Sequence, residues 1–317
     1  MKILVAGSIQ GDGGYEEAAL CGLIAAELRA AGHTADHFML PYERNMLALP
    51  EQLTAYSLLQ INDCDQLITV GYPACVLNHP NKVCYLLQLE PMLAEYWDSQ
   101  YGVLANRQYS DILQAVMHVN DQALRTAKKV YAVSQLLCED IQKTYSVPCT
   151  PALYPALECE GGAEDEDGFI LCETGLLPWQ RPELILDAAA ACRDVRMCIF
   201  VPNTNEVYWD YFQELARGLG ERVRLLRRRA GKADIQASRG IFLPDYQLRR
   251  IPNLAACAIR WGKPAAVMAD SGALLSLFPE SCHIKQQLSR LPRILARAAA
   301  PACALPTGEE FAKELLA

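Results

Sequence analysis

The chain has 317 residues, of which 51% are hydrophobic and 21% charged, and its net charge is -8 at pH 7. This length is too great for one compact doubly wound domain and suits two domains, each with its own core. The excess of acidic residues lies in the first half, and the chain after residue 168 is mildly basic. This distribution lacks the concentrated basic stripe of a nucleic-acid-binding protein and suits an anionic ligand held by the second half.

The amino-terminal sequence MKILVAGSIQGDGG has an apolar run too short for a signal peptide, and no stretch approaches the roughly 18 apolar residues of a membrane span. We therefore expect a cytoplasmic protein without a membrane span. The 13 cysteines are scattered and include no CxxC pair. This pattern predicts reduced thiols buried in the core and no metal site.

Apolar strands alternate with amphipathic helices in the first half, a pattern typical of a parallel sheet covered on both faces. A glycine-rich turn over 7–14 precedes a helix over 15–31, whose apolar stripe includes Leu20 and Leu28. Ser134 is a good amino-terminal cap for a later helix. The expected strands of this half are 3–6, 36–40, 66–70, 83–88, 129–133 and 150–154.

The segment PALECEGGAEDEDG, residues 155–168, contains a run of acids and almost nothing to bury, so we expect a linker there. The alternation then restarts, which predicts an N-terminal domain over 1–154 and a C-terminal domain over 169–317. The expected strands of the second half are 169–172, 196–201, 223–226, 241–243, 265–268 and 282–284. Its expected helices are 182–192, 207–218, 232–238 and 253–261, with an alanine-rich helical end.

Five segments support a more specific interpretation of the order of expected strands and helices. They are MKILVAG with GGYEEAALCGLIAAELRAAGHTAD, then HPNKVCYLLQLEP, AVSQLLCEDIQKTYSVPCTPALYPAL, GLLPWQRPELILDAAAACRDVRMCIF and AIRWGKPAAVMADSGAL. In this order and spacing the chain resembles the retaining GT-B glycosyltransferases, the family that includes bacterial mannosyl- and rhamnosyltransferases. The resemblance covers nearly the whole chain. It implies an α/β GT-B fold of two Rossmann-like domains with a ligand cleft between them, the first on the acceptor side and the second on the donor side.

The resemblance implies transfer of a sugar from a nucleoside-diphosphate sugar to a glycan or lipid-linked acceptor, with the nucleotide sugar as donor and no separate cofactor. A non-catalytic relative that acts as a partner or activator of an active glycosyltransferase is the main alternative. A different enzyme on the same scaffold, such as a sugar-nucleotide epimerase, is a third. The expected protein partners are a second copy of the chain or a partner glycosyltransferase.

The chain departs from the family where its chemistry usually lies. Gly175 and Gln180 stand at the positions of an Arg and a Lys that hold the donor diphosphate. Arg249 and Cys257 stand at the family's pair of glutamates, and Gln88 stands near its active-site histidine. These departures favour the non-catalytic alternative, whereas the preserved order of segments favours an enzyme.

Glu90 is a candidate catalytic acid or base because it follows a strand of the first domain and precedes a proline, although a partly buried structural carboxylate is the competing interpretation. Gln88 is a candidate through the resemblance, because some relatives have a Gln-x-x-Glu-Pro-like sequence in place of the histidine. Arginine is the side chain that best pairs with a diphosphate, so the basic residues near the expected phosphate site are also candidates. A tight turn or a solvated surface charge is the competing interpretation for each candidate, and the three arginines at 227–229 are expected on a surface loop. The candidate donor-binding residues are Gly13, Gly14, Glu173, Thr174, Arg181, Asn203, Asp245, Tyr246, Arg249, Arg250 and Lys263.

Overall fold

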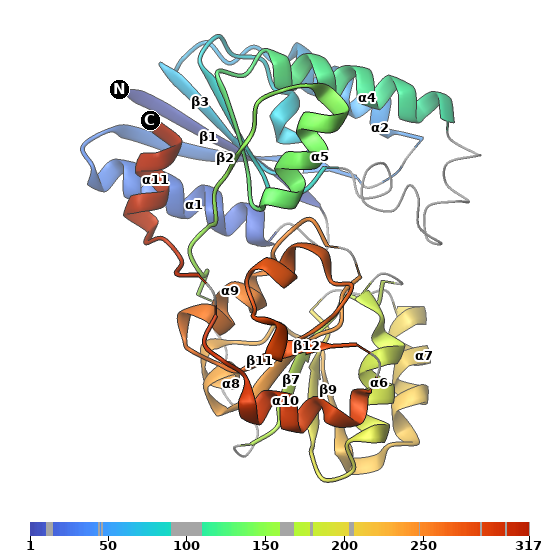
Figure 1. The fold of residues 1–317 in the computed structure, drawn as a ribbon. Coiled ribbons are helices and arrows are strands. Elements are labelled where there is room, and N and C mark those ends of the chain that lie inside the picture. Colours follow the sequence, from blue (N-terminus) through green and yellow to red (C-terminus); the bar gives the residue numbers. More distant parts are fainter. Residues whose placement is uncertain are drawn as a thin grey trace. The chain divides into compact units, whose positions relative to one another are not determined.

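A computed structural model of the chain contains two compact units, Met1–Pro155 with Pro306–Ala317, and Ala156–Leu305. Each unit is built around one six-stranded sheet with helices packed against it (Figure 1). The structure describes residues 1–10, 15–43, 45, 47–89, 110–158, 168–177, 180–202, 206–246, 248–285, 287–301 and 303–316.

The sheet of the first unit is parallel throughout, in the order β2-β1-β3-β4-β5-β6. β3 and β4 are buried along their whole length, as expected of central parallel strands covered on both faces. The strands are β1 (Lys2–Gln10), β2 (Thr34–Tyr42), β3 (Gln66–Val70), β4 (Lys82–Leu86), β5 (Lys129–Ala132) and β6 (Thr150–Pro151). The α-helices are α1 (Tyr15–Ala30), α2 (Leu49–Leu58), α4 (Ser110–Arg125), α5 (Gln135–Tyr145) and α11 (Gly308–Leu316).

The sheet of the second unit is also parallel, in the order β12-β11-β10-β7-β8-β9. Read from the β9 edge, this is the strand order of a Rossmann sheet, which reverses its direction of growth between β7 and β10. The strands are β7 (Ile170–Glu173), β8 (Met197–Phe200), β9 (Val223–Leu226), β10 (Gly240–Leu243), β11 (Ala265–Met268) and β12 (His283–Ile284). The α-helices are α6 (Pro182–Ala191), α7 (Glu206–Arg217), α8 (Lys232–Ala237), α9 (Asn253–Arg260) and α10 (Leu291–Arg297).

Helix α6 shows how the sequence builds this unit. Pro182 opens the helix, where its missing N–H is not needed. Ile185 and Ala189, four residues apart on one helical face, are fully buried in the core of the unit. Glu183 and Asp187 are exposed on the other side. The buried face of α6 therefore fixes the position of the first residues of the helix, next to Arg181.

The carboxyl-terminal segment corrects the expected domain boundary. Residues 306–317, expected in the second domain, belong to the first unit. Phe311 of α11 is fully buried, and its ring meets that of Tyr85 with centroids 4.9 Å apart. The hydroxyl of Tyr131 donates to the backbone carbonyl of Glu314 at 2.9 Å. The apolar face of α11 thus completes the core of the first unit. Most of the expected linker, residues 159–167, lies outside the described residues.

The cysteines mostly occupy the expected core positions. Of the twelve within the described residues, nine are buried. In one pair the thiols are close together, because the Sγ atoms of Cys138 and Cys149 are 2.8 Å apart. The hydrogen bond from Cys149 lowers the pKa of the Cys138 thiol below its ordinary value. Within the described part of the chain, no helix has the length and apolar character needed to cross a membrane.

Candidate functional site at the strand-order reversal of the second sheet

In open parallel sheets, ligands bind beyond the carboxyl ends of the strands at the point where the strand order reverses. In the second unit this point lies between β7 and β10. Glu173 ends β7 and Asp245 follows β10, and the pairing of Leu171 with Ile241 brings the two strand ends to the same edge. We call the surrounding groups the switch-point site. It consists of Glu173, Thr174, Gly175, Leu176, Leu177, Gln180, Arg181, Arg229, Asp245, Tyr246, Arg250 and Asp270.

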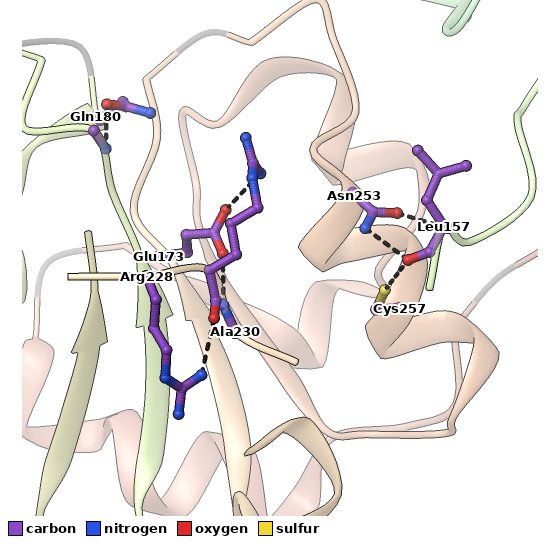
Figure 2. Close-up of polar contacts among 9 residues, drawn as sticks. Leu157, Glu173, Gln180, Arg228, Ala230, Asn253 and Cys257 are labelled. Carbon is purple, nitrogen blue, oxygen red and sulfur yellow. Dashed lines mark hydrogen bonds and ion pairs between the residues drawn. The ribbon is translucent and has the colours of Figure 1, made fainter. Parts of the chain in front are cut away.

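Glu173 is held by the loop that follows β9. Its carboxylate accepts hydrogen bonds from Arg229 Nη1 and from the backbone nitrogen of Ala230, each at 3.2 Å (Figure 2). The side chains of Arg229 and Glu173 are only 23% and 20% exposed, so water screens the pair weakly. The contact places a guanidinium beside the end of β7. The sequence patterns did not suggest Arg229, because the two partners are 56 residues apart.

The turn after β7 gathers backbone N–H groups. Thr174 Oγ1 accepts a hydrogen bond from the nitrogen of Leu176 at 3.1 Å. Gln180 Oε1 accepts from the nitrogens of Gly175 at 2.8 Å and Leu177 at 3.2 Å. Leu176 has a φ of 60°, in the left-handed region. Successive N–H groups in such a turn form a concavity that binds anions. In this structure two uncharged side-chain oxygens accept from these groups.

Arg181 lies at the start of α6 and forms a bidentate ion pair with Asp270, at 2.8 and 2.6 Å. Its guanidinium also lies over the ring of Tyr246, 4.6 Å from the centroid. The Arg181 side chain is 13% exposed, whereas that of Asp270 is 46% exposed. Arginine holds carboxylates and phosphates by bidentate pairing, and stacking on an aromatic ring orients its guanidinium for this. Arg181 is therefore a fixed cation whose partner anion faces solvent.

Asp245 is buried, and its pKa is raised to about 7. Burial is the main cause, because the charged form loses its hydration. The positive charges of Arg250 and Arg181 lower the pKa, and the negative charge of Glu173 raises it. The carboxyl of Asp245 can therefore exchange a proton near neutral pH while it lies within the field of two arginines.

This raised pKa predicts a pH-dependent loss of stability. The folded protein keeps a proton on Asp245 between about pH 4 and pH 7 that the unfolded chain has released. Stability from this group is therefore fully present below about pH 4 and is lost as the pH rises to about 7. Asp245→Asn should gain stability relative to wild type across that interval, measured by chemical denaturation. Asp187→Asn, at an exposed position of α6 in the same unit, is the control, and a pH-independent difference for Asp245→Asn would contradict the assignment.

Arg249 and Arg250 are half-buried in the segment between β10 and α9. The effect of Arg250 on the pKa of Asp245 shows that its charge lies near the switch-point site. The structure thus gathers six of the expected donor-binding residues around the ends of β7 and β10 and adds Arg249 on the adjoining segment. These six are Glu173, Thr174, Arg181, Asp245, Tyr246 and Arg250.

Lys263 does not belong to this group. Its Nζ donates to the backbone carbonyls of Gln236 and Ser238, the latter at 2.9 Å. Lys263 precedes β11 and the two carbonyls precede β10, so the ammonium lies at the amino ends of the strands. The carboxyl ends, where the switch-point site lies, are at the opposite edge of a parallel sheet. The Gly-Lys-Pro turn therefore lies away from the switch-point site.

The three arginines after β9 also differ from expectation. Arg228 forms a bidentate ion pair with Asp234 at 2.6 and 2.9 Å, and its guanidinium lies over the ring of Phe200 at 5.0 Å. The Asp234 side chain is only 3% exposed. Arg227 alone behaves as a surface charge, paired with the exposed Glu206. The expected surface loop is instead held by two ion pairs. Arg228 pairs with the buried Asp234, and Arg229 pairs with Glu173 of the switch-point site.

Cys257, which stands at the position of a family glutamate, has a structural role. Its Sγ donates to the backbone carbonyl of Leu157 at 3.6 Å. The side chain of Asn253 binds both backbone polar groups of Leu157, each at 2.9 Å (Figure 2). Helix α9 therefore uses this face to anchor the first residues of the second unit.

The remaining expected site residues lie in the first unit or outside the described residues. Gln88 is half-buried just beyond the carboxyl end of β4.

The first unit has two further features that the sequence did not suggest. In β1 of the same sheet, the hydroxyl of Ser8 is buried and has no hydrogen-bond partner among the described residues. A pocket of about 440 Å³ in this unit lies instead at the amino ends of β5 and β6, beside Lys128 and Lys129. Gly13, Gly14, Glu90 and Asn203 lie outside the described residues.

Comparisons with known proteins bear on the fold. No family model and no curated protein sequence matches the chain. Among solved structures it is similar to HepE of Anabaena in complex with UDP-glucose, with a TM-score of 0.62 at 15% identity, over 94% of this chain and 89% of that one. It is also similar to a glycosyltransferase from Rickettsia africae, with a TM-score of 0.58 at 12% identity, over 99% and 92% of the two chains.

A UDP-GlcNAc 2-epimerase from Neisseria meningitidis, bound to UDP-GlcNAc, is similar as well, with a TM-score of 0.52 at 10% identity, over 100% and 98% of the chains. These similarities extend over both units. The α/β GT-B fold expected from the sequence is therefore confirmed. Similarity at such low identity establishes the fold alone, and a reaction would depend on the particular residues of this chain.

Proposed function

We propose that the chain is a glycosyltransferase that binds a nucleoside-diphosphate sugar at the switch-point site and transfers the sugar to a glycan or lipid-linked acceptor. The observation that carries the proposal is the fixed guanidinium of Arg181, stacked on Tyr246 beside the end of β7. Its exposed partner Asp270 is the group that a diphosphate would replace. The UDP and UDP-sugar complexes among the structural neighbours support the choice of ligand for this fold.

The site offers positive charge where such a reaction needs it. Transfer of a sugar leaves a nucleoside diphosphate with developing negative charge, and positioned cations stabilise that charge. The charges of Arg181 and Arg250 act on Asp245, and Arg229 lies beside Glu173 at the neighbouring strand. Asp270, paired with Arg181, and Glu173, paired with Arg229, offset part of this positive charge in the absence of ligand. An incoming diphosphate would therefore exchange one anion for another on preformed cations, without an uncompensated charge in either state.

Nucleotide binding tests the proposal directly. We expect UDP or another nucleoside diphosphate to bind the wild type in a calorimetric titration. Arg181→Ala, Arg249→Ala and Arg250→Ala should each weaken that binding by about 1.5–3 kcal/mol, the usual value of a hydrogen bond to a charged group. Arg217→Ala is the matched control, because Arg217 is an exposed arginine at the far end of α7 and should change binding by less than about 0.5 kcal/mol. Equal, near-zero effects at the three site arginines would contradict the proposed site.

A non-catalytic partner or activator is the second candidate. It is favoured by the absence of a cation at Gly175 and Gln180 and by the structural use of Cys257. Release of the nucleoside diphosphate from a panel of nucleotide sugars, with glycan and lipid-linked acceptors, separates the two. Nucleotide binding without any release, together with stimulation of a second glycosyltransferase, would support the activator.

A further inference from the structure

Two thiols of the first unit meet beside the edge of its sheet. The Sγ atoms of Cys138 and Cys149 are 2.8 Å apart, although the residues are 11 positions apart in the sequence. Cys138 lies in the first turn of α5, and Cys149 immediately precedes the edge strand β6. Both are thiols in this structure. The sulfurs of a disulfide are about 2.05 Å apart, so a bond between these two needs them to approach by less than about 1 Å.

The backbone around the pair is held in place by its own hydrogen bonds. The side chain of Ser134 caps the amino end of α5, the turn that carries Cys138. At the other end of the helix, Ser146 has a φ of 54°, in the left-handed region, and ends the helix. Gln142 Nε2 of α5 then donates to the backbone carbonyl of Cys149 at 3.4 Å. The segment before β6 is therefore bound to the helix, and this contact brings the two sulfurs together.

The contact also changes the acidity of the thiols. The hydrogen bond from Cys149 lowers the pKa of Cys138 below its ordinary value, against the effect of burial. By contrast, burial raises the pKa of Cys64 and of Cys84 in the same unit. A thiolate is the form of cysteine that oxidants attack, so Cys138 is the most readily oxidised of these three. Its partner Cys149 is only half-buried and gives solvent access to the pair.

We propose that Cys138 and Cys149 form a redox-active dithiol, which a hydroperoxide converts to a disulfide and a thiol reductant restores. One sulfur gives an electron pair to an oxygen of hydrogen peroxide and becomes a sulfenic acid, with release of one water. The other sulfur displaces the hydroxyl of that sulfenic acid, which leaves as a second water, and the S–S bond forms. Two thiols and one hydrogen peroxide thus give one disulfide and two waters.

The disulfide would join the first turn of α5 to β6, the strand after which the chain leaves the first unit at Pro155. Two equivalents of a small thiol, which are themselves oxidised to a disulfide, return Cys138 and Cys149 to the reduced state. This inference concerns the first unit and does not rest on the proposed function, whose site lies in the second.

Counting thiols tests the inference on the full chain. Reduced protein is treated with hydrogen peroxide, the peroxide is removed with catalase, and the remaining thiols are alkylated in denaturant. The oxidised chain should take up two alkyl groups fewer than the 13 of the reduced chain, and dithiothreitol should restore all 13. Peptide mapping without reductant should identify a link between Cys138 and Cys149. Cys138→Ser and Cys149→Ser should each abolish this link, because neither variant retains both sulfurs.

Cys64→Ser is the matched control. Cys64 is a half-buried cysteine of the same unit, and its Sγ contacts Nε2 of His79 at 3.6 Å. This variant should form the same disulfide as the wild type. A link that maps to other cysteines, or sulfinic acid at Cys138 in place of a link, overturns the inference. A wild type that keeps all 13 thiols while free glutathione in the same solution is oxidised also overturns it. None of these outcomes depends on whether the protein binds a nucleotide.

Discussion

Replacement of Phe311 by alanine is expected to lower the free energy of unfolding of the first unit by about 3–5 kcal/mol, the usual cost of removing a buried aromatic side chain. Phe311 is fully buried and lies edge-on to the ring of Tyr85. Its loss leaves a cavity against β4, which the surrounding strands cannot close. Hydrogen exchange of the β4 and β5 amides reports the stability of this unit by itself.

Lys313→Ala is the control for the helix. Lys313 is 63% exposed and pairs with Glu309 on the same helix, so its replacement should leave the exchange of the β4 and β5 amides unchanged. If Phe311→Ala altered exchange in β10 and β11 instead of β4 and β5, the assignment of α11 to the first unit would be wrong. Equal exchange in both variants would also contradict it.

Replacement of Arg228 by alanine is expected to destabilise the second unit by about 3 kcal/mol, because it leaves the buried carboxylate of Asp234 without its ion-pair partner. The stacking of Arg228 on Phe200 is lost as well. Unfolding of this unit by itself can be followed by the hydrogen exchange of its β8 and β10 amides as denaturant is added. The destabilisation should appear in denaturant titrations as a lower midpoint with little change in slope.

Arg227→Ala provides the comparison at the adjacent position. Arg227 and its partner Glu206 are 42% and 70% exposed, so water screens the pair and its loss should have little effect on stability. A double variant without both Arg228 and Asp234 should recover much of the loss, since no buried charge then lacks a partner. If Arg228→Ala cost no more than Arg227→Ala, the loop would be the surface feature that the sequence suggested.

The fold could be predicted from the sequence because its signals are local. Each strand of the second sheet is a short apolar run between turn residues, and three predicted strands, 66–70, 223–226 and 265–268, match the structure to the residue. Helices α2 and α4 were not among the expected helices. The apolar stripe of α2 is weak, whereas α4 has a clear apolar face that includes Leu113, Val116 and Leu124. The carboxyl-terminal helix is predictable as a helix but was assigned to the wrong unit, because periodicity does not indicate which core a helix covers.

The candidate site was only partly predictable, and the reason is the sequence distance between partners. Side chains that end strands, such as Glu173 and Asp245, could be placed because the carboxyl ends of parallel strands share one edge. The pairing of Arg181 with Asp270 joins residues 89 positions apart and leaves no local pattern. Lys263 was expected near the ligand because of a family motif. Its position before β11 instead places it at the amino ends of the strands of the second sheet, opposite the switch-point site.

The chain passes between the two units twice, once after Pro155 and again after Leu305. In topological terms the second unit is therefore an insertion near the end of the first. Because a protein is synthesised from its amino terminus, the second unit can complete its core while the first still lacks Phe311 and Leu315. During synthesis the first unit should remain an incomplete domain, open at the apolar surface that α11 later covers, until residues 306–317 have left the ribosome. A nascent chain stalled after residue 305 should then bind chaperones through that surface, whereas the released chain should not.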